Sequence, residues 1–161
     1  MNKELTNAFL VFILLGIISY AFFFNFENDV NTQRIANLTD EWIKNVTIIN
    51  NPNKVANMFC SDAKLIATVS KIIRREFDIE QYFNFFANLP NIEVLEKNYN
   101  IQKITEDVYI NTAFLKWYWE GLVKPLNVRM TFIFRNKCIV QLHASELPEF
   151  NKDLYIISGY S

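Results

Sequence analysis

The stretch VRMTFIFRNKCIVQLHASELP, which covers Val128–Pro148, carries the clearest pattern in the chain. Its two halves, Val128–Phe134 and Cys138–Ser145, are rich in the β-branched and aromatic residues that strands favour. Residues 135–137 separate them by the spacing of a hairpin turn. The stretch therefore predicts two antiparallel strands, with Pro148 closing the domain.

Two longer strands are expected just upstream of this hairpin. Asn91–Lys103 is a long alternating stretch, and Val108–Trp119 alternates with a heavy aromatic content. Glu106 and Asp107 mark a turn between them. A shorter strand is expected earlier, at Ala63–Ser70, because that segment is also rich in β-branched residues.

The part of the chain ahead of these strands has helical periodicity. A short polar linker is expected at Phe26–Asn31, and an amphipathic helix follows it. A short second helix is expected with Asn53 as its cap. A third helix, Ile79–Leu89, has Asp78 as its expected N-cap and ends before Pro90. The apolar face of the first helix consists of Ile35, Leu38, Trp42, Val46 and Ile49.

The order of these elements predicts the fold class. Helix, helix, strand, helix and then four strands separate the helices from a run of antiparallel strands, which is typical of α+β domains. A strongly curved sheet wrapped around a helix would bury the aromatic residues and leave a cavity. The chain has 161 residues, of which 51% are hydrophobic, enough for one sizeable core. Its net charge of −1 and the lack of a long basic cluster argue against a nucleic-acid partner.

The hairpin and the element order together resemble the SnoaL-like proteins of the nuclear transport factor 2-like superfamily. Arg129–Phe132 looks like the R-x-T-F of that group, and Val140–Pro148 looks like its V-H-x-H-x-S-x-x-P ending. Within the group, the chain is most similar to the association domain of calcium/calmodulin-dependent protein kinase II, and Phe77–Pro90 loosely matches a helix of that branch. The chain departs from the family at two points. Gln141 stands where the family usually has His, and the Trp that the family usually has near the position of Cys138 is not found here.

This resemblance implies a fold and several partners. The fold is a cone-shaped, cystatin-like α+β domain in which a curved antiparallel sheet wraps around helices. The partners are a second copy or more of the chain, in a homodimer or higher homo-oligomer, and a small acidic or apolar ligand. The superfamily contains both enzymes and non-catalytic binding or assembly domains, so the fold does not decide the function. No cofactor is expected.

The amino-terminal part of the chain predicts a membrane anchor. Residues 1–7 form a short leading segment, and residues 8–26 contain an uncharged run long enough for a spanning helix. A cleaved signal peptide and a buried globular helix are the alternatives. Lys3 precedes the run, which places the amino terminus in the cytoplasm and the 27–148 domain outside, in a periplasmic or extracytoplasmic space. A tail, 149–161, follows the domain.

The two cysteines, Cys60 and Cys138, lack the spacing of a redox motif or a zinc site. Two buried, unpaired cysteines are expected here rather than a disulfide. No metal site is expected either, since the chain has one histidine and no carboxylates cluster near it.

Arg129 is the most interesting candidate for ligand binding. Alternation along its strand, with the hairpin paired without interruption, places Arg129 on one face with Thr131, Leu142 and Ala144. In the association-domain branch, the matching Arg lies in a pocket. A buried Arg needs an anionic partner, which is either an acidic ligand or a carboxylate of the same chain. Tyr82 and Trp117 are aromatic candidates for the lining of the same cavity, although core filling explains them equally simply.

Three residues offer the chemistry of an enzyme. His143 is a candidate base, Asp62 is a carboxylate between a helix and a strand, and Tyr109 is a possible donor. Each also has a structural explanation, and nothing in the sequence brings them together. We therefore expect a membrane-anchored, non-catalytic domain for ligand binding or assembly. The alternatives are a cofactor-independent enzyme of the ketosteroid isomerase type, acting on an apolar carbonyl compound, and a VirB8-like secretion component.

Overall fold

The computed structural model describes residues 3–68, 70, 72–75, 77–86 and 88–147. Within the first helix, it describes the side chains at positions 13–20 and from Val30 onward. The predicted tail at 149–161 lies outside the described residues.

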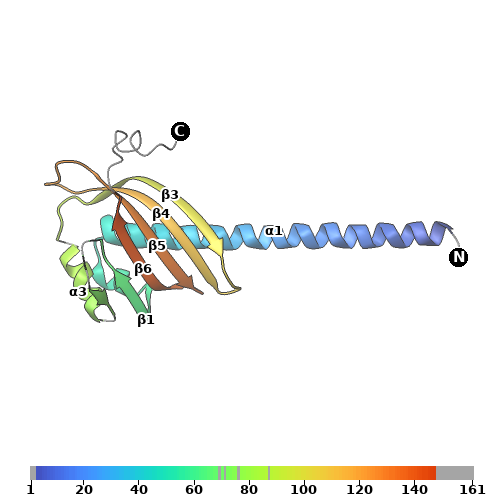
Figure 1. Cartoon of the computed structure of the whole chain (residues 1–161), viewed down its shortest axis with the longest axis horizontal. Helices are drawn as coiled ribbons and strands as arrows, with labels where there is room; N and C mark the ends of the chain where they lie inside the picture. The colour runs from blue at the N-terminus through green and yellow to red at the C-terminus, as the bar shows by residue number, and fades with distance from the viewer. Residues whose placement is uncertain (1–2, 69, 71, 76, 87, 148–161) are drawn as a thin grey trace, which may run out of the picture.

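The first helix, α1, runs without interruption over Lys3–Thr47. Its amino-terminal half projects away from the domain, and its carboxy-terminal half lies in the curve of the sheet (Figure 1). The polar linker predicted at Phe26–Asn31 is therefore wrong. That segment contains no Gly or Pro, so nothing in it breaks a helix that continues on both sides. Over the residues whose side chains are described, no helix has an apolar stretch long enough to cross a membrane.

The predicted apolar face of α1 largely faces the sheet. Ile35, Trp42 and Val46 are buried, and Leu38 packs against the same core. Ile49 does not belong to this face, because the helix ends two residues earlier and its side chain is 41% exposed.

Two short helices follow. The second, α2, spans Pro52–Ala56, and its N-cap is Asn51 rather than the predicted Asn53. The Asn51 side chain accepts a hydrogen bond from the Lys54 backbone N–H at 3.0 Å, and Pro52 takes the first helical position, where no N–H is needed. The third, α3, spans Phe77–Phe86, so Asp78 lies in its first turn rather than at its cap.

The sheet has six strands in the order β2-β1-β6-β5-β4-β3. From β3 to β6, each strand pairs antiparallel with the next, as the sequence predicts. β1 instead pairs parallel with β6, so the sheet is mixed and the expectation of a purely antiparallel sheet is wrong. The strands are β1 (Phe59–Ile66), β2 (Ile73–Arg74), β3 (Glu93–Lys103), β4 (Val108–Tyr118), β5 (Leu126–Arg135) and β6 (Cys138–Glu146).

The core lies between the concave face of this sheet and α1, with α3 at one end of the cone (Figure 1). Two polar ties hold α1 in place. The buried Asn111 of β4 donates a hydrogen bond to the Thr39 hydroxyl at 2.8 Å. At the edge of the sheet, Asp40 accepts from Lys97 and Tyr99 of β3. Burial and the Asp40 carboxylate raise the pKa of Tyr99, so its hydroxyl stays protonated and can donate.

Candidate functional site

A cavity of about 130 Å³ lies between the concave face of the sheet and the helices. Its wall is almost wholly aliphatic and aromatic, and it carries one carboxylate, Glu146. The lining residues from the sheet side are Leu65, Ala67, Thr68, Trp117, Trp119, Leu126, Val128, Met130, Leu142, Ala144 and Glu146. Those from the helices are Trp42 of α1 and Tyr82, Phe83 and Phe86 of α3.

The period of two along each strand places these side chains inside the cone. Successive strand residues point to opposite faces, and residues directly opposite each other on paired strands share a face. Trp117 lies opposite Leu126, and Met130 lies opposite Ala144. The sheet therefore supplies the wall of the cavity from four neighbouring strands, β1, β6, β5 and β4.

Trp42 joins the wall of the cavity to the rest of the core. Its ring meets those of Phe83, Trp117 and Phe132 edge to face, with centroids 5.8, 6.3 and 5.2 Å apart. Such contacts fix ring orientation because the edge of one ring meets the negative face of the next. The indole N–H groups of Trp42 and Trp117 are buried without a hydrogen-bond partner among the described residues. Both tryptophans thus contribute ring surface to the site.

The polar groups of the site lie on its rim. Glu146, the last residue of β6, is exposed and lies opposite Val128. Tyr82 is half-buried, and burial raises the pKa of its hydroxyl. The Arg74 guanidinium lies over the outer side of this rim, 4.8 Å from the centre of the Tyr82 ring, and donates to the Ser70 hydroxyl at 2.8 Å.

Sequence reasoning found only part of this site. Tyr82 and Trp117 line the cavity, whereas Glu146 was not among the candidates. The strand alternation could have identified Glu146. Leu142, Ala144 and Glu146 follow each other at intervals of two residues along β6, so all three lie on the concave face.

Arg129 does not lie where the uninterrupted hairpin placed it. Its side chain is exposed on the convex face of the sheet, 5.7 Å from the centre of the Phe114 ring. Arg129 is opposite Ser145, and Thr131 is opposite His143, so neither shares a face with Leu142 or Ala144. The prediction is wrong because β6 has an extra residue between the partners of Ile133 and Phe134.

This irregularity is a β-bulge, and it changes every side chain that follows it. Phe134 pairs with Ile139 and Ile133 pairs with Gln141, which leaves Val140 unmatched. One unmatched residue moves the rest of a strand to the opposite face because the side-chain period is two. Leu142 and Ala144 therefore face the cavity, and His143 faces outward.

The three candidate catalytic residues are not brought together. Tyr109 is fully buried on the concave side, opposite Phe134, and its hydroxyl has no hydrogen-bond partner among the described residues. His143 is exposed on the convex side, and Asp62 is exposed beside Arg135. The Arg135 guanidinium donates to the Asp62 carboxylate at 2.7 Å and holds the pKa of that carboxyl below its usual value.

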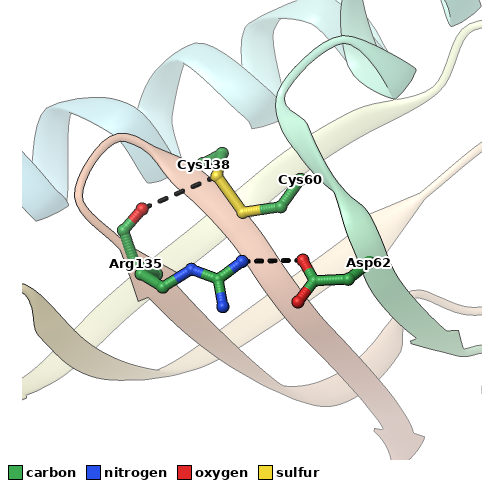
Figure 2. The surroundings of a disulfide bond; sticks show 4 residues. All are labelled: Cys60, Asp62, Arg135 and Cys138. Carbon is green, nitrogen blue, oxygen red and sulfur yellow. Dashed lines mark hydrogen bonds and ion pairs between the residues drawn. A yellow bond between two sulfur atoms is a disulfide. The ribbon is translucent and has the colours of Figure 1, made fainter.

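Cys60 and Cys138 form a disulfide, so the expectation of two unpaired cysteines is wrong (Figure 2). The parallel pairing of β1 with β6 explains the bond. Phe59 lies opposite Ile139, which brings the two cysteines to a Cα–Cα distance of 5.2 Å, within the range that a disulfide spans. The Asp62–Arg135 ion pair lies directly beside it. Among the described residues, no group of three His, Cys, Asp or Glu side chains is placed to hold a metal ion.

No family model matches the chain, and no curated protein matches it significantly. Solved structures do. A protein from Xanthomonas campestris, titled as a calcium/calmodulin-dependent protein kinase II association domain, is 25% identical with a TM-score of 0.60, over 72% of this chain and 87% of its own.

Two further neighbours bear the names of enzymes. A protein from Streptomyces avermitilis, titled as a dehydratase of the nuclear transport factor 2-like family, has a TM-score of 0.68 and 11% identity, over 75% of this chain and 99% of its own. A protein from Parabacteroides distasonis, titled as a ketosteroid isomerase, has a TM-score of 0.57 and 16% identity, over 73% of this chain and 88% of its own.

The chain therefore has the nuclear transport factor 2-like, cystatin-like fold. Within that class, the similarity to a structure of the association-domain branch agrees with the prediction made from the hairpin sequence.

Proposed function

We propose that this protein is a membrane-anchored, non-catalytic domain whose cone-shaped cavity holds a small apolar group. The cavity itself carries the proposal. A concave, mainly apolar space with a few polar groups on its rim is the usual form of a small-molecule site. At about 130 Å³, it is close in size to an engineered protein cavity of roughly 150 Å³ that binds benzene.

The arrangement of polar groups favours binding over catalysis. General acid–base catalysis needs a base within hydrogen-bond reach of its substrate, and an oxyanion needs a donor aimed at it. His143 and Asp62 lie outside the cone, and Tyr109 is buried away from the cavity lining. Glu146, on the rim, is the one carboxylate that a bound molecule would meet.

The experiment is a ligand titration on the full chain in lipid nanodiscs, followed by the fluorescence of the cavity tryptophans. Benzyl alcohol, which has a benzene-sized apolar group, is expected to bind the wild type. Ala144→Leu fills the cavity from a buried lining position and should abolish the signal, whereas Thr131→Leu introduces the same side chain on the convex face and should not. Equal binding by both variants would refute a site in the cavity. Turnover of an apolar ketone by the wild type would favour the isomerase-type alternative.

A membrane anchor is part of the proposal. Residues 8–24 are uncharged, and the side chains described within that run lie exposed on the projecting helix, where the domain does not cover them. Leu14 is 61% exposed and Ile17 is 60% exposed, so the core of the domain buries neither of them. A helix that is apolar on all sides is stable where a bilayer surrounds it.

The proposed side of the membrane is extracytoplasmic. Lys3 precedes the apolar run, and the positive-inside rule then places the domain outside. The Cys60–Cys138 disulfide supports the same side, because such bonds persist in oxidising compartments. Protease added to intact spheroplasts tests this placement. Digestion of the domain supports an extracytoplasmic side, and protection of the domain contradicts it.

Assembly through the convex face of the sheet is a second role, favoured by the similarity to an association domain. This face presents the exposed Phe114 with Arg129 above it, and aromatic and Arg side chains are enriched in protein interfaces. Light scattering of the full chain in detergent should give the mass of a dimer or larger oligomer. Arg129→Glu should lower that mass, and a monomeric wild type would exclude this role.

A further inference from the structure

We infer that the group held in the cavity is an organic cation, such as a quaternary ammonium, with its charge beside the Glu146 carboxylate. This inference rests on the proposed function and adds the charge of the ligand to it.

The walls of the cavity contain aromatic rings that lie in different planes. Six of its lining side chains are aromatic. The Trp117 ring stands at 88° to that of Trp42 and at 88° to that of Phe86, so these three rings do not form a flat stack. Aromatic faces are negative, and cages of several rings are the usual receptors for quaternary ammonium groups. The six aromatic lining residues are Trp42, Tyr82, Phe83, Phe86, Trp117 and Trp119.

The charge on the rim has the matching sign. Glu146 is the one carboxylate among the residues that line the cavity, and none of those residues is Lys or Arg. Within the described part of the chain, Glu146 has no ion-pair partner. A cation in the cavity would pair with this free carboxylate, whereas an anion would meet it unpaired. The acidic ligand expected from Arg129 does not fit here, since that residue lies on the other face of the sheet.

A cation of this chain contacts one of these six rings from outside the cavity. The Arg74 guanidinium lies over the ring of Tyr82, 4.8 Å from its centre. Arg74 itself belongs to a neighbouring hollow with Ser70 and is not part of the cavity lining. A bound ammonium group is therefore best placed between Trp117 of β4 and Glu146 of β6, which lie on either side of β5, because the sheet order separates β4 from β2, the strand of Arg74.

Size supports a small head group. The cavity is close to the volume that accepts benzene, and a trimethylammonium group is of similar size. The rest of a larger cation would extend past the rim. The ligand class is thus a quaternary ammonium with three small substituents on its nitrogen, or a protonated cyclic amine, and not a long fatty acid.

The test compares three molecules of nearly the same shape. Choline carries a positive head, 3,3-dimethylbutan-1-ol is its neutral carbon analogue, and 3,3-dimethylbutanoate is an anionic counterpart. Isothermal titration uses the full chain in nanodiscs of lipids without choline head groups, with empty nanodiscs as the blank. We expect choline to bind about tenfold tighter than the neutral analogue, as cation–π and carboxylate contacts require, and the anion to bind least.

Two variants assign the charge preference to the site. Glu146→Gln should lower choline affinity about tenfold and leave the neutral analogue within about twofold, because it removes a charge and keeps the shape. Glu93→Gln, on the exposed edge strand, is the matched control and should change neither. Trp119→Leu keeps an apolar side chain on the rim and should weaken choline more than the neutral analogue.

The outcomes separate this inference from the proposed function. If the neutral analogue binds as tightly as choline, or if Glu146→Gln leaves choline affinity unchanged, the cation inference is overturned and the apolar cavity stands. If neither of these molecules nor benzyl alcohol binds the wild type, the cavity is not a ligand site and both proposals fail.

Discussion

The two faces of the sheet differ in what they carry and in what that content achieves. The concave face bears Trp117, Met130 and other apolar side chains that meet α1 and α3 around a cavity. The convex face bears Arg129 and His143, the side chains with the richest chemistry, in contact with solvent. Reactive residue types alone therefore do not mark a site in this fold. The face to which a residue belongs decides whether it can meet a ligand.

The largest effect should come from the ring at the centre of the concave side. Trp42→Ala removes a side chain that is 1% exposed and in contact with three other aromatic rings, and it should lower the free energy of unfolding by about 3–5 kcal/mol. Phe114→Ala, on the convex face at 42% exposure, should cost less than about 1 kcal/mol. Urea titrations of both variants check this. Equal losses would break the distinction between the faces.

The next effect concerns the edge where β1 joins the rest of the sheet. Replacing Cys60 and Cys138 together by Ser removes a bond between residues 78 positions apart, and it should cost about 2–4 kcal/mol. The physical reason is that the reduced unfolded chain has more conformations. Unfolding of the double variant and of the reduced wild type should coincide. A wild type that loses no stability on reduction would contradict the prediction.

A smaller effect should come from the polar tie inside the cone. Thr39→Val keeps the shape of the side chain and leaves the buried Asn111 amide without its acceptor, which should cost about 1–3 kcal/mol. Thr47→Val is the matched control, because the Thr47 hydroxyl donates to the Ile43 carbonyl on a half-buried face of the same helix. Thermal unfolding should show a clear loss for the first variant and little for the second.

The smallest effect should be the acid dependence of the exposed ion pair. Arg135 lowers the pKa of Asp62 in the folded state, so the pair stabilises the fold above the unfolded pKa of about 3.9. This stabilisation disappears as the pH falls through the lower, folded pKa. Asp62→Asn should therefore lower the melting temperature slightly at neutral pH and match the wild type at strongly acid pH. A constant difference across the titration would show that the effect is not electrostatic.

Much of the fold was predictable because its signals are local. The break in the apolar pattern after Phe134 and the alternation on either side of it predict the hairpin. β5 and β6 lie there, joined by Asn136 and Lys137. The spacing of Ile35, Trp42 and Val46 predicts the helix face that the sheet covers. In each case, the period of the apolar residues comes from the geometry of a single element.

The site was less predictable because it depends on register between elements. The unmatched Val140 places Arg129 and His143 on the same face of the sheet, whereas the uninterrupted hairpin places them on opposite faces, and no residue type in the sequence indicates a bulge there. The disulfide depends in the same way on β1 returning parallel to β6, beside Cys138. Strand pairing between segments far apart in the sequence produces no local periodic pattern of apolar residues, so the sequence alone does not predict it.

Because α1 is continuous, it also fixes the rotation of the domain relative to the amino-terminal apolar run. A helix turns by about 100° and advances about 1.5 Å for every residue. If the apolar run is held in a bilayer, as proposed, the number of residues between that run and Ile35 sets two quantities. They are the rotation of the domain about the helix axis and the height of the cavity above the lipid. Insertion of one residue near Asn31 would swing the domain by more than a quarter turn, and insertion of seven would return it nearly to its starting direction, about 10 Å farther out. The length of α1 between the apolar run and Ile35 thus determines which way the domain faces.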